Sequence, residues 1–200
     1  MTIGRVRSVG LTGGIAAGKS TVGRMLEERG FTVVDADRLV ASLYEPGGEG
    51  SRAVRDLFGP ELLTGSGAVD RETVARRVFR DAAARRRLEA AIHPLVRRRF
   101  EEIAARTEGI AVLEATLLVE AGWGEGFDAL ITVEAPRETR MGRAVARGLS
   151  RQEAEARLRA QGRSENRRRA ADFVIENDGS LVDLERRVDA VVGELSGARG

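Results

Sequence analysis

The chain has 200 residues, of which 42% are hydrophobic and 32% charged, and its formal net charge is +2. It contains no run approaching the roughly 20 apolar residues of a membrane span, no hydrophobic leader segment and no cysteine, so a membrane helix, disulfides and thiolate chemistry are excluded. We therefore expect a cytoplasmic protein of one α/β domain with a small insertion, and the balanced charge gives little support for nucleic acid as a partner.

The first predicted elements are a strand over residues 6–11 and a helix over residues 21–29 that ends at Gly30. Residues 13–20 lie between them and match the pattern G-x-x-x-x-G-K-[ST] in full. Such a loop turns its backbone N–H groups around phosphates at the start of a helix. The pattern predicts an ATP-binding segment made of Gly13, Gly14, Ile15, Ala16, Ala17, Gly18, Lys19, Ser20 and Thr21.

Lys19 is the single lysine among 33 basic residues, and all the others are arginine. A compact ammonium fits between two phosphates, whereas a planar guanidinium does not. We expect Lys19 to reach the β- and γ-phosphates and the hydroxyl of Ser20 to bind Mg²⁺. Composition and motif therefore indicate the same phosphate-binding loop.

A second strand is predicted over residues 32–34, beside the strand of the phosphate loop, and it ends in Asp35-Ala36-Asp37. A helix over residues 38–44 follows. Asp37 is our candidate for the group that accepts the proton of an acceptor hydroxyl. The alternative is that Asp37 only caps the following helix.

The segment from residue 38 to 107 is predicted to be mainly helical, with helices over 51–58, 71–80, 82–92 and 95–107. Pro94 is expected to kink or restart the last of these helices. His93, the only histidine, precedes that proline. A role in a pocket and a packed or solvent-facing position both remain open for it.

Three arginine triplets lie in predicted helices, at residues 85–87, 97–99 and 167–169. Acidic residues flank them and few aromatic residues are near. We interpret most of these arginines as members of salt-bridged helix surfaces, while some could line a pocket for an anionic substrate.

The remaining strands are predicted over residues 110–113, 129–133 and 173–175. Helices are predicted over 137–147, over 151–161 after a Ser150-x-x-Glu153 capping box, and after Ser180, which caps the last helix together with Asp183. Alternating strands and helices predict a parallel sheet with right-handed crossovers, whose ligands bind beyond the carboxyl ends of the strands. Glu114 and Asn177 follow two such ends. Glu114 is a candidate to hold Mg²⁺ through water, with a capping role as the alternative.

Four arginines are spaced along the helix over residues 137–147, at positions 137, 140, 143 and 147. A helix of this kind next to a second arginine-rich helix is typical of a mobile lid. The guanidinium of such a lid stabilises charge that develops on a transferred phosphoryl group.

Several ordered stretches together resemble the dephospho-coenzyme A kinase family, over about residues 9–192. They are the lead-in Leu-Thr-Gly-Gly-Ile to the phosphate loop, Val-Asp-Ala-Asp at 34–37, His-Pro-Leu-Val at 93–96, Leu-Leu-Val-Glu at 117–120, the lid region 143–161 and Ala-Asp-Phe-Val-Ile-Glu-Asn at 171–177. The resemblance implies a three-layer α/β/α P-loop fold with a parallel sheet. It divides the chain into a nucleotide core (1–37, 108–136 and 171–200), a helical coenzyme A-binding insertion (38–107) and a lid (137–170).

What the resemblance implies about function is ATP-dependent phosphorylation of the ribose 3′-hydroxyl of dephospho-coenzyme A, the last step of coenzyme A synthesis. The partners are these two small molecules and Mg²⁺ with ATP, without nucleic acid or membrane, in a monomer or weak homo-oligomer. Carried over by position, the catalytic residues are Asp37, Lys19 and Arg143. Asn177 joins the ATP site, Ser20 and Glu114 bind the metal, and the acceptor contacts Thr12, Asp37, His93 and Leu117.

Three positions depart from the family pattern. Thr116 stands where proline is usual, Arg140 where glutamine is frequent, and Ala16-Ala17 where Gly-Ser or Gly-Ala is usual. We expect Arg140→Gln to be mild, and alanine at position 16 to be tolerated if its φ is negative.

Other classes of protein fit the sequence less well. Another P-loop small-molecule kinase, such as one for nucleoside monophosphates, is the nearest alternative, and the helical insertion with His-Pro disfavours it. A GTPase would need an N-K-x-D motif, which the chain lacks. A nucleic-acid-dependent ATPase would be stimulated by DNA or RNA, which we do not expect.

Overall fold

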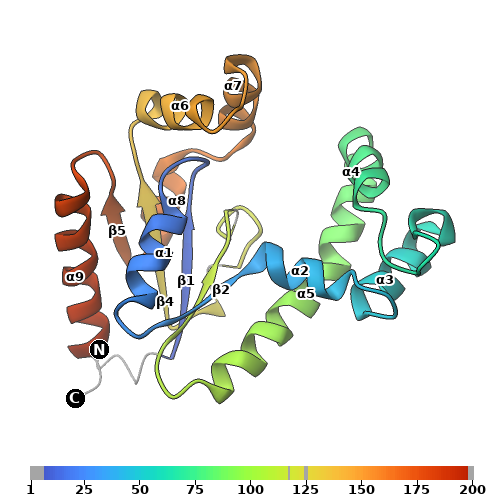
Figure 1. Cartoon of the computed structure of the whole chain (residues 1–200), viewed down its shortest axis with the longest axis horizontal. Coiled ribbons are helices and arrows are strands. Elements are labelled where there is room, and N and C mark those ends of the chain that lie inside the picture. The colour runs from blue at the N-terminus through green and yellow to red at the C-terminus, as the bar shows by residue number, and fades with distance from the viewer. Residues whose placement is uncertain (1–6, 117, 124–125, 198–200) are drawn as a thin grey trace. The chain divides into compact units, whose positions relative to one another are not determined.

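The computed structural model describes residues 7–116, 118–123 and 126–197. The chain forms two compact units, one made of residues 1–34 and 107–200 and the other of residues 35–106 (Figure 1). Within the described ranges, no helix is both long enough and apolar enough to cross a bilayer.

The first unit is built on a five-stranded sheet in the order β2-β3-β1-β4-β5. Its strands are β1 (Ser8–Gly13), β2 (Thr32–Asp35), β3 (Ala111–Glu114), β4 (Ala129–Glu134) and β5 (Phe173–Glu176). β1 pairs in parallel with both β3 and β4, and β4 pairs in parallel with β5. The predicted α/β fold with a parallel sheet is therefore confirmed.

The expectation that β2 neighbours β1 is wrong, because β3 lies between them. Burial explains this order. The first three residues of β3 are fully buried, whereas β2 has exposed residues at both ends. A strand that is apolar throughout is stable in the middle of a covered sheet, and a partly polar strand suits an edge.

Helices α1 (Lys19–Glu27) and α9 (Leu181–Gly197) pack against each other and against the sheet. Their apolar faces and the strands form one buried cluster, to which β1 contributes Val9 and Leu11. Gly30 ends the first helical segment with a φ of 84°, as predicted. The remaining helices of this unit are α6 (Arg137–Ala146), α7 (Arg151–Ala160) and α8 (Ser164–Ala170).

Two predicted helix caps are confirmed. The hydroxyl of Ser150 accepts a hydrogen bond from the backbone N–H of Glu153, and the Glu153 carboxylate accepts one from the backbone N–H of Ser150. Ser180 and Asp183 make the same reciprocal bonds at the start of α9. These caps satisfy N–H groups that have no partner inside their helices.

The second unit is helical. It consists of α2 (Ala36–Leu43), α3 (Glu49–Phe58), a 3₁₀ turn η1 (Pro60–Leu62), α4 (Arg71–Arg80) and α5 (Ala82–Arg106). Helices α2, α3 and α4 each pack against α5, which is the element that organises the unit (Figure 1).

The expected restart at Pro94 is wrong, because α5 is one continuous helix of 25 residues that includes the proline. Ile92, Val96 and Phe100 are spaced four residues apart and are all buried. Because residues at this spacing share one helix face, their burial holds the helix together across the proline, while Pro94 itself is exposed.

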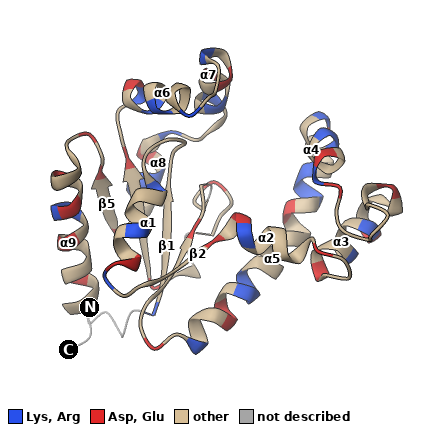
Figure 2. Cartoon of the chain, viewed as in Figure 1, with Lys and Arg blue, Asp and Glu red and all other residues tan. Residues whose placement is uncertain are grey.

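The triplet at residues 97–99 is salt-bridged as predicted. Arg97 pairs with Glu101, Arg98 with Glu49 and Arg99 with Glu102, and every one of these side chains is substantially exposed. Basic and acidic residues accordingly alternate along α5 (Figure 2). Such exposed pairs contribute little to stability.

Arg167 is different from the other arginines of its triplet, because its side chain is only 1% exposed. Its guanidinium binds both carboxylate oxygens of Glu134, at 2.7 and 3.1 Å, and Glu134 is itself 1% exposed. A further guanidinium nitrogen bonds Glu120 at 3.0 Å. Burial alone would lower the pKa of Arg167, but these carboxylates raise it, so the charge is retained.

We expect Arg167→Ala to lower the free energy of unfolding by about 3–5 kcal/mol, because it leaves the buried Glu134 carboxylate without its partner. In a chain of this size the melting temperature should fall by roughly 10 °C. Arg168→Ala is the matched control, since Arg168 pairs with the half-exposed Glu176, and it should cost about 1 kcal/mol at most. If both variants lowered the melting temperature by the same amount, the buried pair of Arg167 with Glu134 would not have the special stabilising role assigned to it.

Candidate nucleotide-binding site

The phosphate loop (residues 13–20) connects β1 to α1, as the motif requires. Gly13 and Gly18 have φ values of 149° and 108°, which disfavour residues with a side chain. A β-carbon at Gly13 would lie 2.3 Å from the backbone oxygen of Val133 in the neighbouring strand. The two glycines of the motif are therefore required by the conformation of the loop.

Ala16 has a φ of 57°, so the negative φ under which alanine was expected to be tolerated here is not what the loop adopts. A left-handed conformation costs a residue with a β-carbon roughly 1–2 kcal/mol. The methyl group of Ala16 is buried against Met141 and Ala144 of α6 and Ala154 and Leu158 of α7. This apolar contact offsets the strain and attaches the loop to the two helices predicted to form the lid.

The two residues predicted to bind the metal lie together. The hydroxyl of Ser20, in the first turn of α1, donates a hydrogen bond of 2.9 Å to a carboxylate oxygen of Glu114, at the end of β3. A hydroxyl and a carboxylate are oxygen ligands of the kind that Mg²⁺ takes, usually with several waters. The donor set therefore fits the predicted metal.

Lys19 lies at the start of α1 and its ammonium donates to the backbone oxygen of Gly13 at 3.1 Å. The lysine side chain thus folds back over the loop. The ammonium therefore lies against the loop that is predicted to bind phosphates.

Asn177 follows β5, and its side chain contacts the backbone of the phosphate loop. The buried Asn177 amide donates to the backbone oxygen of Ala17 at 2.7 Å. Arg143 of α6 donates to the same oxygen at 3.4 Å and to the backbone oxygen of Asn177 at 3.2 Å. The structure therefore brings Asn177 and Arg143 together at the phosphate loop.

A second contact between the predicted lid and the loop was not anticipated from the sequence. The side-chain oxygen of Gln161, just after α7, accepts a hydrogen bond of 2.7 Å from the backbone N–H of Ile15. The only sequence signal is that Gln161 ends the lid stretch that resembles the family.

A pocket of about 160 Å³ opens beside the loop. Its walls combine loop and helix residues with arginine side chains and the apolar start of α9, namely Gly18, Thr21, Arg143, Arg147, Asn177, Gly179, Leu181 and Leu184. The pocket is therefore mainly polar and positively charged, with one apolar side formed by the two leucines.

Of the residues predicted to contact the acceptor, Thr12 is fully buried in β1. Its hydroxyl donates to the backbone oxygen of Thr116 at 3.3 Å, at the position where the family usually has proline. Leu117 lies outside the described residues.

Asp37 and His93 belong to the second unit. Asp37 lies in the first turn of α2, where its side chain is exposed. The cap of this helix is Asp35, whose carboxylate accepts the N–H of Asp37 at 2.8 Å. The interpretation of Asp37 as the N-cap is therefore wrong, because the helix begins two residues earlier than predicted.

His93 is partly buried on α5. Burial lowers the pKa of its imidazole, and the carboxylate of Glu89 only partly opposes this. Since an ordinary histidine has a pKa of about 6.5, His93 is neutral at pH 7. It can exchange hydrogen bonds there without contributing a charge.

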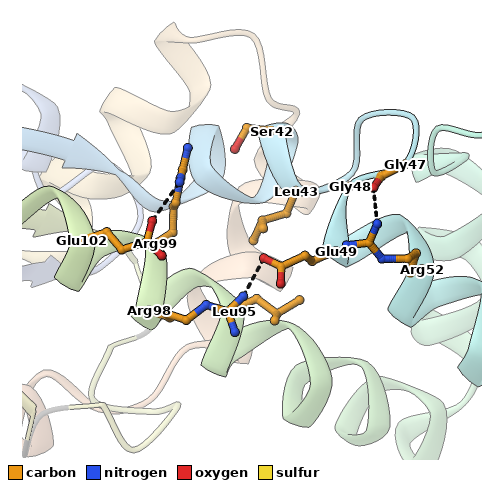
Figure 3. A pocket seen from close by; sticks show the side chains of 10 residues that line it. All are labelled: Ser42, Leu43, Gly47, Gly48, Glu49, Arg52, Leu95, Arg98, Arg99 and Glu102. Atoms are coloured by element: carbon orange, nitrogen blue, oxygen red, sulfur yellow. Dashed lines mark hydrogen bonds and ion pairs between the residues drawn. The ribbon is translucent and has the colours of Figure 1, made fainter.

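The second unit contains a pocket of about 310 Å³ between the end of α2, the start of α3 and α5 (Figure 3). Three arginines line it, but each has a partner within the pocket wall. Arg98 binds Glu49, Arg99 binds Glu102, and Arg52 donates to the backbone oxygen of Gly47. The pocket is therefore polar without a large excess of positive charge.

The family model described as dephospho-CoA kinase matches residues 7–183 of the chain. A dephospho-CoA kinase of Frankia casuarinae is 45% identical over 196 residues, which cover 96% of this chain and 85% of the relative. A dephospho-CoA kinase of Anaeromyxobacter dehalogenans is 42% identical over 200 residues, with 98% and 95% covered.

Solved structures are similar to this chain over nearly its whole length. A crystal structure from Thermus thermophilus aligns with a TM-score of 0.82 at 43% identity, over 96% of this chain and 98% of the other. Dephospho-CoA kinase from Campylobacter jejuni aligns with a TM-score of 0.71 at 27% identity, over 97% and 99%. A shikimate kinase from Acinetobacter baumannii, with a TM-score of 0.55 and 15% identity over 96% and 94%, shares the fold.

Proposed function

Because the chain belongs to the dephospho-CoA kinase family, we propose that it transfers the γ-phosphoryl group of ATP to the ribose 3′-hydroxyl of dephospho-coenzyme A, giving coenzyme A and ADP. The observation that carries this proposal is the family match over residues 7–183. None of the relatives described above favours a nucleoside monophosphate kinase.

We place the triphosphate of ATP on the phosphate loop, with Lys19 at the β- and γ-phosphates. The adenine ring would occupy the pocket of about 160 Å³ between Arg147 and Leu181. Ser20 and Glu114 would hold Mg²⁺, which neutralises charge on the phosphates when bound. Asn177 supports this site indirectly, because its amide fixes the carbonyl of Ala17 within the loop.

The unit of residues 35–106 is our candidate for the part that receives dephospho-coenzyme A. We propose that the exposed carboxylate of Asp37 accepts the proton of the 3′-hydroxyl as its oxygen attacks the γ-phosphorus and ADP leaves. Neutral His93 would donate or accept a hydrogen bond with the acceptor, without adding charge. The chain would act in the cytoplasm as a monomer or weak homo-oligomer.

We expect Arg143→Ala to lower kcat about 100-fold, the scale for removing one donor that stabilises transition-state charge, while KM for ATP changes far less. The guanidinium that now bonds Ala17 and Asn177 lies at the loop and can turn to the phosphoryl group. Steady-state kinetics with ATP varied at saturating acceptor measures both constants. A large rise in KM with unchanged kcat would show that Arg143 only binds ATP.

The substrate proposal is tested by ADP release with dephospho-coenzyme A, AMP and shikimate as alternative acceptors. We expect turnover with dephospho-coenzyme A and at most trace activity with the other two. Preferred turnover of AMP would favour a nucleoside monophosphate kinase. DNA or RNA added to the same assay should leave ATP hydrolysis unchanged.

A further inference from the structure

Arg140 of α6 has an environment unlike that of the other lid arginines. Its Nε atom is buried and has no hydrogen-bond partner among the residues that the structure describes. Among these described residues, no carboxylate forms an ion pair with the Arg140 guanidinium. By contrast, Arg137, one turn earlier on the helix, is paired with Glu155.

The guanidinium of Arg140 lies directly against the phosphate loop. A β-carbon built on Gly14 would be 2.0 Å from its Nη1 atom and 3.1 Å from its Cζ atom. Only a glycine at this position allows so close an approach. The Nη2 atom of Arg167 is 3.3 Å from the same point, so two guanidinium groups converge on one side of the loop.

The buried carboxylate of Glu134, whose charge acts on Arg140, is already bonded to Arg167. Both oxygens of Glu134 accept hydrogen bonds from Arg167, and one also accepts the hydroxyl of Thr132 at 2.9 Å. Burial lowers the pKa of Arg140, and the charge of Arg167 lowers it further, while Glu134 acts in the opposite direction. Even so, an arginine stays charged near neutral pH. Arg140 is therefore a partly buried cation that forms no ion pair with any residue that the structure describes, and holding it there costs free energy.

A cation held in this state is stabilised when an anion arrives. We propose that the Arg140 guanidinium binds a phosphate oxygen of a substrate seated at the phosphate loop, as a third positive group beside Lys19 and Arg143. This inference rests on the proposed function for its substrates, whose phosphates are those of ATP and the diphosphate of dephospho-coenzyme A. Glutamine, frequent in the family at this position, would keep a hydrogen-bond donor there without the charge.

The test compares Arg140→Met, Arg140→Gln and the control Arg137→Met, which removes the same charge from the exposed side of the same helix. Calorimetry gives the dissociation constants of a non-hydrolysable ATP analogue and, separately, of dephospho-coenzyme A. Thermal unfolding of the ligand-free proteins reports the cost of the buried charge.

We expect Arg140→Met to weaken binding of at least one ligand by about 10- to 100-fold, the scale of hydrogen bonds to a charged group. Arg140→Gln should lose less, and Arg137→Met should bind as the unmodified protein does. The ligand-free melting temperature of Arg140→Met should be unchanged or higher. A loss confined to the ATP analogue identifies the nucleotide phosphates, and a loss confined to dephospho-coenzyme A identifies its diphosphate.

Two results would overturn the inference. One is binding of both ligands by Arg140→Met within twofold of the unmodified protein. The other is a fall in the ligand-free melting temperature with equal affinity losses in Arg137→Met, which would make Arg140 a structural residue. If the unmodified protein binds the ATP analogue but not dephospho-coenzyme A, the acceptor proposal fails, while the ATP comparison still tests Arg140.

Discussion

Lys19→Arg is expected to reduce kcat by about 10³-fold or more, nearly as much as Lys19→Ala, although it keeps the positive charge. The loop holds the ammonium within 3.1 Å of the backbone oxygen of Gly13. A guanidinium is planar and wider, so it cannot take the place of a compact charge between two phosphates. Loss of a single donor to transition-state charge already costs about 10²–10³ in kcat.

The measurement is kcat for both variants at saturating ATP and acceptor, together with thermal unfolding to confirm the fold. Arg24→Ala is a suitable control, because Arg24 lies on the same helix and forms a long, exposed pair with Glu28. Near-normal turnover by Lys19→Arg would remove the reason for assigning a special role to the single lysine.

Asp37→Asn is expected to reduce kcat by about 10²–10⁴, the range for a positioned general base, with KM for ATP nearly unchanged. The amide has the same shape as the carboxylate but cannot take up the proton of the acceptor hydroxyl. Because Asp35 provides the cap of α2, the melting temperature of Asp37→Asn should also change little.

The matched control is Asp35→Ala, which removes the cap and should lower the free energy of unfolding by about 1 kcal/mol while most of kcat remains. Comparing the two variants distinguishes Asp37, the proposed general base, from Asp35, the helix cap. If Asp37→Asn lost stability but not turnover, the assignment of the base would be contradicted.

Local sequence signals predicted the nucleotide-binding half of the fold well. The phosphate loop, its flanking strand and helix, and the two Ser-x-x-acid caps each depend on a few consecutive residues, and all were confirmed. The proximity of Ser20 and Glu114, the two residues predicted to bind the metal, was also anticipated, because parallel strands end at one edge of the sheet.

Features that depend on distant residues were not predictable in the same way. The insertion of β3 between β1 and β2 depends on which strand is buried on both faces. Pro94 stays within α5 because buried apolar neighbours outweigh its local cost. Tertiary packing also determines that Arg167, and not Arg168, is buried in its triplet.

The φ of Ala16 is a further example, because the contacts that tolerate it come from α6 and α7, more than 120 residues away along the chain. The same holds for Arg140. From the sequence it was one of several lid arginines, and only its position against Gly14 sets it apart. Residue type alone indicated the chemistry of these sites. It did not indicate which of several residues of the same type occupies the position where that chemistry is possible.

The most direct test of the account is to identify the product formed from ATP, Mg²⁺ and dephospho-coenzyme A by the purified protein. We expect equal amounts of ADP and coenzyme A, with the new phosphate seen by ³¹P NMR as a monoester on the ribose 3′-oxygen. No coenzyme A in the presence of ADP release, or phosphorylation of a different acceptor in preference, would contradict it.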